Sequence, residues 1–237
     1  MKRITAGVMT TAMLMAGYVQ TSYAAAGDND RPKLDERMNA ARAVIDEVMS
    51  VPDKAIPQGI LAGAACVVVI PGFKKGAFVV GAQYGQGVAT CRTGHGWSAP
   101  VFVRLEGVSY GLQIGGQSTD LILVAMNQDG LQKMLANKVK LGADAAASAG
   151  PVGRNAQAGT DWKLNAEFLT WSRSKGLFAG IDLDGTVLSQ DGDDTRIIYG
   201  ADVPFKVILA GGQPVPEDAK PFVRTVARYF VVAKANH

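Results

Sequence analysis

The sequence predicts a single α+β domain, in which an antiparallel β-sheet or partial barrel is flanked by N- and C-terminal helices. The 237 residues contain no low-complexity linker that would separate two domains, and 28 of them are glycine, a residue common in tight turns. Short apolar runs bounded by Gly, Ser or Asn fill the middle of the chain. The spacers between these runs are too short for helical crossovers, so neighbouring strands are expected to be antiparallel.

The first 26 residues have the pattern of a secretory signal peptide. Lys2 and Arg3 precede an apolar stretch that runs from residue 4 to residue 19. Small residues then occupy positions −3 and −1 of two cleavage sites, Ser22 and Ala24 for the first and Ala24 and Ala26 for the second. A membrane anchor fits less well, because a spanning helix needs about 20 apolar residues. We therefore expect export to the periplasm or the medium, with the mature protein peripheral on a membrane. The expected organisation is a signal peptide at 1–24 with cleavage after Ala24 or Ala26, a disordered leader at 25–32 and one domain at 33–234.

Helical periodicity marks both ends of the expected domain. Apolar residues recur at helical spacing from Lys33 to Ser50, and Pro52 ends that pattern. A last amphipathic segment runs from Asp218 to Ala233, with Phe222 and Val226 on its apolar side. Helices are predicted at 33–50, 53–61, 128–135 and 218–233.

The strand pattern begins with the continuous apolar run 66–70, which Pro71-Gly72 is expected to stop. Residues 203–209 fit a helix or a strand equally well. Strands are predicted at 66–70, 76–83, 87–91, 97–105, 108–114, 120–126, 145–149, 166–172, 176–183, 186–189 and 196–199.

The two cysteines leave two interpretations open. Export would place Cys66 and Cys91 in a compartment where a disulfide persists. Such a bridge would close a loop of about 25 residues and stabilise the fold by roughly 3 kcal/mol. Alternatively, Cys66 is a buried free thiol within its apolar run.

Two segments match catalytic motifs without their usual surroundings. Residues 181–187 match the nucleophile motif of haloacid-dehalogenase-like phosphatases, in which Asp182 and Asp184 would act beside magnesium. That fold needs several parallel crossover units after the motif, so a β-turn is the favoured interpretation. Residues 107–111 match a hydrolase nucleophile elbow around Ser109, but the next segment is predicted to be a strand rather than a helix.

Composition argues against several classes of partner. Removal of Lys2 and Arg3 would reduce the formal net charge of +3 by two, so the mature chain is almost neutral and no nucleic-acid partner is expected. Two histidines and two cysteines provide no metal-spaced cluster, and no phosphate-binding loop or dinucleotide fingerprint occurs. We expect neither a metal nor a cofactor.

Six segments follow one another along the chain: 79–87, 97–100, 111–120, 141–144, 150–154 and 172–180. Together, in this order, they resemble the SYLF family of lipid-binding proteins, whose eukaryotic members include yeast actin regulators. The resemblance covers roughly residues 35–230 and implies a non-catalytic, lipid-binding domain. Binding to phosphoinositides or other anionic phospholipids is described for eukaryotic members, in which an amphipathic N-terminal helix contributes to membrane contact. In this chain, the charges of the corresponding helix depart from a basic membrane-binding pattern.

Three places offer basic residues for contact with phospholipid. In the segment 71–76, Phe73 would enter the headgroup boundary while Lys74 and Lys75 face anionic phosphates; the alternative is a loop with Phe73 in the core. The first predicted helix offers Arg37 and Arg42, although its apolar stripe also fits packing against the sheet. The remaining candidates lie in the family-like segments, where they form either a basic pocket or fold-stabilising hydrogen bonds: Arg154, Arg173 and Lys175.

The sequence thus favours an exported, non-enzymatic protein that contacts phospholipid or a membrane surface. The alternative is a protein-interaction module of the cell envelope, which would dock a partner through its N-terminal helix. A magnesium-dependent phosphatase that uses Asp182 and Asp184 is a third, remote reading. Actin binding is not expected for an exported chain.

Overall fold

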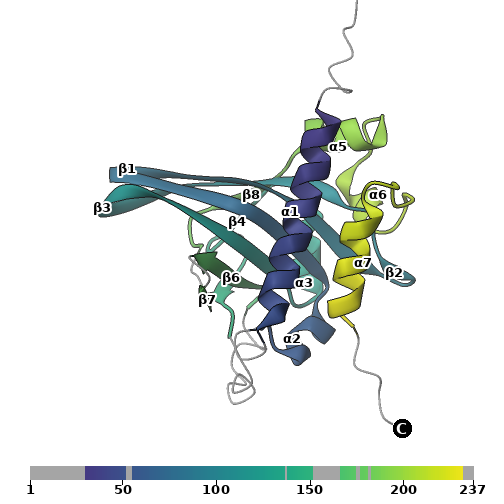
Figure 1. Ribbon diagram of the computed structural model, residues 1–237, viewed down its shortest axis with the longest axis horizontal. Helices are drawn as coiled ribbons and strands as arrows, with labels where there is room; N and C mark the ends of the chain where they lie inside the picture. The colour runs from purple at the N-terminus through teal and green to yellow at the C-terminus, as the bar shows by residue number, and fades with distance from the viewer. Residues whose placement is uncertain are drawn as a thin grey trace, which may run out of the picture.

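A computed structural model describes residues 30–51, 55–136, 138–151, 166–174, 177–180 and 183–231. It shows a curled mixed sheet, with α1 (Arg31–Ser50) and α7 (Lys220–Tyr229) side by side across one face (Figure 1). The predicted α+β class with flanking terminal helices is therefore confirmed. Among the described residues, no helix has both the length and the apolar character needed to span a bilayer. The predicted signal peptide and residues 25–29 of the predicted leader lie outside the described residues. Arg31 and Pro32, which were expected in the leader, are the first residues of α1.

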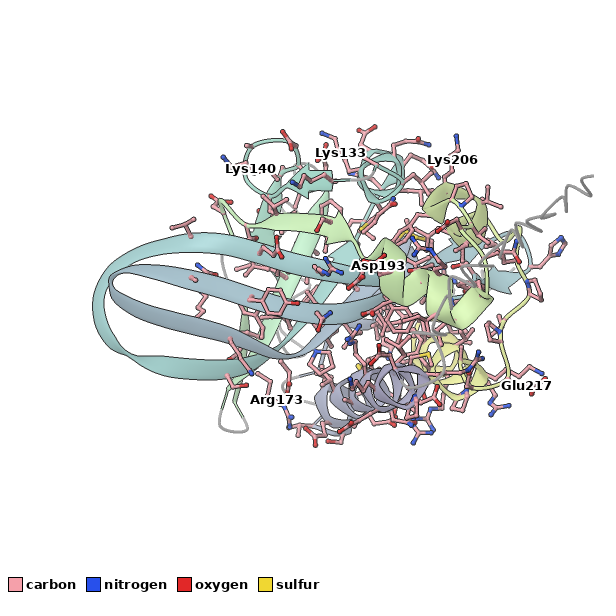
Figure 2. The ribbon with its side chains drawn as sticks, turned by 90° about the horizontal axis from the view of Figure 1, so that it is seen from above. Lys133, Lys140, Arg173, Asp193, Lys206 and Glu217 are labelled. Carbon is pink, nitrogen blue, oxygen red and sulfur yellow. A yellow bond between two sulfur atoms is a disulfide. The ribbon has the colours of Figure 1, made fainter. Side chains whose placement is uncertain are left out.

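The centre of the sheet consists of two long strands that each double back on themselves. These are β1 (Cys66–Thr93) and β3 (Val101–Ala125), and their antiparallel pairing runs from Cys66↔Ala125 to Ala89↔Val101. The two ends of β1 meet, because the Cα atoms of Cys66 and Cys91 are 4.0 Å apart. Figure 2 shows β1 and β3 as nested loops that project away from the helices.

A glycine permits the close approach of the two halves of β1. A Cβ atom at Gly87 would overlap the carbonyl oxygen of Val69 on the outgoing half. Any larger residue at this position would hold the halves apart.

Shorter strands extend the sheet on both sides of this centre. β6 pairs with the second half of β3 and β8 with its first half, while β4 pairs with β8. All of these pairs are antiparallel, but β5 runs parallel to β6, so the sheet is mixed. The short strands are β2 (Gly96–Trp97), β4 (Lys138–Lys140), β5 (Ala147–Ala149), β6 (Phe168–Ser174), β7 (Leu177–Gly180) and β8 (Val187–Gln190).

The end of the sheet that lies under the helices, which we call its root, is buried on both faces. Val67 and Val69 pack in the core beneath α1 and α7, whereas Val68 and Ile70 pack in a second core on the opposite face. Successive side chains of a strand point to opposite faces, so a strand covered on both sides is a continuous apolar run. The second core is closed by α3 (Gln128–Met134) and α6 (Phe205–Leu209).

Several predicted elements differ from the structure. The strand predicted at 196–199 is wrong: these residues belong to α5 (Gly192–Tyr199), which starts at its N-cap Asp191 and ends at Gly200 with φ +69°. The run at 203–209, left open by the sequence, contains helix α6. Pro71-Gly72 does not end the first strand but accompanies a shift of register between Ile70 and Phe73. The second helix, α2 (Gln58–Gly63), starts after Pro57 rather than at residue 53, and β4 was not predicted.

Candidate functional site

A small basic hollow lies where α1 meets the uncovered part of β1. Its volume is about 210 Å³, and we call it the Arg37–Lys74 pocket. It is lined by Arg37, Pro71, Gly72, Lys74, Tyr84, Gly85 and Gln86.

The doubling of β1 brings the strand residues of this pocket together. Lys74 lies on the outgoing half of β1, and Tyr84 and Gln86 lie on the returning half. α1 crosses only the root of the sheet, so the projecting part stays uncovered on this side (Figure 1). Tyr84 is accordingly 43% exposed and Lys74 is also exposed.

Two carboxylates behind the pocket hold its side chains in place. Arg37 Nη1 donates to Asp194 Oδ2 at 2.5 Å, and Gln86 Nε2 donates to Asp191 Oδ2 at 3.2 Å. Arg104 binds both oxygens of Asp191, at 2.7 and 2.6 Å. The network joins α1, β1, β3 and α5, so the pocket has a fixed lining.

The same network sets the ionisation of these two carboxyl groups. Burial opposes the charge of Asp191, but hydrogen bonds from Arg104 and from the backbone of Asp194 outweigh it and lower the pKa of Asp191. Burial raises the pKa of Asp194, and the neighbouring Asp191 charge adds to this, against the opposing effect of Arg37. Arg104 and Arg37 thus each have an acidic partner, Asp191 and Asp194 respectively.

The lining of the pocket fits an anion. Two cationic side chains, a phenol and an amide provide hydrogen-bond donors, and no carboxylate is among the lining residues. Within the described part of the chain, no group of three or more His, Cys, Asp or Glu side chains is arranged to hold a metal ion. The arrangement can bind an anionic oxygen group such as a phosphate.

The structure places Phe73 and Lys75 away from this pocket. The Phe73 side chain is fully buried in the second core, so the ring is not available to enter a headgroup region. The alternative interpretation is correct about its burial, but the segment around it belongs to β1 and is not a loop. A Cβ at Gly85 would lie 2.8 Å from the Phe73 ring, which shows how glycine leaves room for it. Lys75 is half-buried and follows Lys74 on the opposite face of the strand.

The other candidate cations do not join Arg37 and Lys74. Arg173 forms ion pairs with Asp120, at 2.5 Å, and with Glu47, so it stabilises the contact between β6, β3 and α1. Arg42 is half-buried on α1 and has no ion pair among the described residues. Arg154 and Lys175 lie outside the described residues.

Helix α1 is fixed to the body of the protein. Met38 and Ile45, on the stripe considered for membrane contact, are buried beneath the helix. Arg31 pairs with Asp218 at 2.6 Å, and α1 also has ion pairs to α5, α7 and β6. The helix therefore presents mainly polar side chains to solvent.

A disulfide closes the root of the doubled strand. Cys66 and Cys91 are bonded with an S–S distance of 1.99 Å, and both residues are fully buried. The bridge joins the first and the returning halves of β1 next to the core.

The two catalytic motifs lie in structural contexts that do not fit their chemistry. Asp184 and Gly185 form a turn in which the Thr186 backbone N–H donates to the Leu183 carbonyl at 3.0 Å, with φ +81° at Gly185. Asp182 lies outside the described residues. Ser109 lies within β3, which continues as a strand on both sides of it, whereas a nucleophile elbow requires a turn into a helix.

Sequence reasoning missed Tyr84 and Gln86 as parts of the site. Both lie in the family-like segment 79–87, and their two-residue spacing would place them on one face of a strand. The ion pair between Arg104 and Asp191 joins residues 87 positions apart, and no local pattern could have revealed it.

Comparison with known proteins supports a family assignment. Residues 106–229 match the family model Ysc84, described as "Las17-binding protein actin regulator". The chain is 33% identical over 177 residues to the SH3 domain-containing protein PJ696.02 of Schizosaccharomyces pombe, covering 73% of this chain and 41% of that protein. It is 33% identical over 172 residues to the human SH3 domain-containing YSC84-like protein 1, covering 71% and 50% of the two chains. Protein YSC84 of Saccharomyces cerevisiae is 30% identical over 190 residues, covering 78% and 40%.

The chain spans half or less of the length of these relatives, and the similarity includes most of the described domain. The family model alone covers more than half of the chain, including most of β3 and the helices α3, α5, α6 and α7. The chain belongs to the Ysc84 (SYLF) family.

Proposed function

We propose that this is a non-enzymatic binding protein that contacts anionic phospholipid through the Arg37–Lys74 pocket and the sheet surface beside it. The observation that carries the proposal is the pocket itself, a hollow whose lining contains Arg37 and Lys74 and no carboxylate. Arg37 is paired with Asp194, so Lys74 contributes the cation that has no ion pair among the described residues. Each lysine or arginine near an anionic membrane contributes about 1 kcal/mol of attraction.

Apolar groups next to the pocket support the proposal. Tyr84 pairs with Glu106, and Ala82 pairs with Val108, so these side chains share one face of the projecting strands. Val108 is 58% exposed and Tyr84 is 43% exposed. A tyrosine combines an apolar ring with a polar hydroxyl, which suits the boundary between headgroups and acyl chains.

Glu106 opposes the attraction and provides a sharp test. Its exposed carboxylate lies on the same face as Tyr84, so it repels an anionic surface. We expect Lys74→Gln to weaken binding about fivefold and Glu106→Gln to strengthen it by a similar factor, since each changes one charge worth about 1 kcal/mol.

The measurement is co-sedimentation with vesicles of phosphatidylcholine, alone or mixed with phosphatidylglycerol, at low and high salt. Binding is expected only to the mixed vesicles and to decrease with salt. Lys140→Gln is the matched control, because this exposed lysine lies on the side of the sheet away from α1 (Figure 2). If Lys74→Gln and Glu106→Gln bind like the unmodified protein, or if no vesicle binds, the proposal is wrong.

Interaction with another protein is the second candidate function. It rests on the names of the matching family and of relatives, one of which is the LAS seventeen-binding protein 3 of Saccharomyces cerevisiae. Loss of a captured partner on Glu36→Ala and Asn39→Ala, which change exposed side chains of α1, with no change in vesicle binding, would favour this function over the first.

Export is a further part of the proposal, and the sequence of residues 1–26 is its support. Mass spectrometry of the protein recovered from its native source is expected to give a mature N-terminus at residue 25 or 27. An intact first residue would contradict export by this route.

A further inference from the structure

A second hollow lies at the root of the sheet, distinct from the Arg37–Lys74 pocket. It has a volume of about 540 Å³ and lies between the end of α2, the end of β1 and the start of α3; we call it the Arg92 hollow. Its size is in the range of small-molecule sites, about 300–1,000 Å³. The apolar part of the lining is formed by Ala62, Ala65, Met126 and Leu131.

Of the described residues that line this hollow, Arg92 alone carries a charge. Its guanidinium donates from Nε to the carbonyl of Ala64 at 3.0 Å, and from Nη2 to the carbonyls of Leu61 and Phe230 at 3.3 and 3.0 Å. It also stacks over the ring of Trp97, 4.7 Å from the centroid. Arg92 Nη1 donates to no residue in the described part of the chain.

The guanidinium of Arg92 also has no acidic counter-ion among the described residues. Burial lowers the pKa of Arg92, and no neighbouring carboxylate contributes to its electrostatic environment. An anion in the adjoining hollow would provide the counter-ion that this half-buried cation lacks.

The surroundings of Arg92 limit the charge of such an anion. Ala64 and Phe230 are the C-cap residues of α2 and α7, and the carbonyl groups at a helix C-terminus carry partial negative charge. These carbonyls offset part of the positive field of the guanidinium, which disfavours a doubly charged group relative to a singly charged one. The two N–H groups of Nη1 are the donors that remain on Arg92, and a carboxylate can accept from them.

We propose that the Arg92 hollow binds a small monoanionic amphiphile, with its carboxylate on Arg92 and a short alkyl chain against Ala62, Ala65 and Met126. This inference is independent of the proposed phospholipid contact, because it uses other residues and another part of the fold.

The test is isothermal titration calorimetry of the purified full chain with octanoate, octanol and octylammonium. Octanoate is expected to bind at least about tenfold more tightly than octanol, the factor expected from a charge-assisted hydrogen bond. Octylammonium is expected not to bind, because its charge has the same sign as that of Arg92. Lys74→Gln is expected to leave octanoate binding unchanged, which separates this site from the Arg37–Lys74 pocket.

Two variants probe the hollow itself. Arg92→Gln removes the charge and is expected to abolish the preference for octanoate, although it also removes contacts to two helix ends. Ala62→Leu fills the hollow without touching Arg92, and we expect it to weaken octanoate binding about tenfold at an unchanged melting temperature. Ala43→Leu, on the exposed side of α1, is the matched control and is expected to bind like the unmodified protein.

The proposal is overturned if octanol binds as tightly as octanoate, if folded Ala62→Leu binds octanoate normally, or if octanoate does not bind at all. Loss of octanoate binding in Lys74→Gln would also overturn it, because the ligand would then occupy the other site.

Discussion

Replacement of Asp35 by asparagine is expected to stabilise the protein at neutral pH. Asp35 on α1 and Asp218 just before α7 each have one buried carboxylate oxygen without a hydrogen bond among the described residues. Arg31 Nε and Nη2 both donate to Asp218 Oδ2, at 3.0 and 2.6 Å, which leaves the other oxygen of Asp218 unpaired. Burial raises the pKa of Asp35, and the Asp218 charge raises it further, against the weaker opposing effect of Arg31.

The magnitude follows from what asparagine removes and adds. It removes a partly desolvated charge and the repulsion from Asp218, and its amide N–H₂ can donate to the unpaired Asp218 oxygen. A hydrogen bond to a charged group stabilises by about 1.5–3 kcal/mol. Loss of the attraction to Arg31 and the partial exposure of the cluster reduce this, so we expect a gain of about 1 kcal/mol.

The dependence on pH has a definite sign. The folded-state pKa of Asp35 lies above its ordinary value of 3.8, so its favourable contribution is fully present below that value and is lost as pH rises through the folded pKa. The advantage of Asp35→Asn should therefore be full at neutral pH and disappear in acid. Tyr199 does not interfere, because burial, assisted by Asp218, raises the pKa of its hydroxyl, which donates to the Pro100 carbonyl at 2.6 Å.

The assay is urea denaturation of both proteins across the acid-to-neutral range. Glu36→Gln, an exposed acid-to-amide change one position along α1, is the control, and its stability should change by less than about 0.5 kcal/mol. A less stable Asp35→Asn protein at neutral pH, or a gain that does not vary with pH, would refute the reasoning.

Three further stability predictions can be checked by urea denaturation with circular dichroism. Replacing both Cys66 and Cys91 by alanine should lower the free energy of unfolding by about 3 kcal/mol, because the bridge spans 25 positions; an unchanged value would show that the loop is already restricted in the unfolded chain. Gly87→Ala should cost at least about 2 kcal/mol, since its Cβ would overlap backbone across the doubled strand, and a normal urea midpoint would contradict that geometry. Arg104→Met should lower the free energy of unfolding by about 2 kcal/mol at neutral pH, because the fully buried carboxylate of Asp191 loses a bidentate partner whose own side chain is 36% exposed. The loss should be smaller in acid, where Asp191 becomes protonated.

The terminal helices could be predicted from sequence because their buried positions repeat locally. The α1 residues expected on its apolar stripe are buried against the sheet, as are Phe222 and Val226 of α7. The run that became α5 has three consecutive apolar residues, Ile197 to Tyr199, which suggested a strand. The missed signal was the N-cap Asp191, whose carboxylate accepts from the backbone N–H of Asp194 three positions later.

The doubling of β1 could not be predicted in the same way. The runs 66–70 and 87–91 were each recognised as strands, but nothing local shows that they lie close together as the two halves of one strand. For the same reason, Arg37 and Lys74 were candidates from separate segments, and only the fold brings them together. Burial of Phe73 depends on the space left by Gly85 on the returning half, a contact between residues twelve positions apart.

Energetics decide which surface of the protein can meet a membrane. Lifting α1 from the sheet would expose its buried side chains and break its ion pairs to α5, α7 and β6. Larger apolar side chains contribute about 1.5–3 kcal/mol each when buried, so detachment would cost about 10 kcal/mol, comparable with the whole stability of a typical domain. The few cations freed would recover about 1 kcal/mol each at an anionic surface. The α1 side chains that detachment would expose are Leu34, Met38, Ala41, Val44, Ile45 and Val48. Contact through the uncovered face of β1 and β3 requires no such rearrangement, and the mutations that test it therefore belong on that face and not on α1.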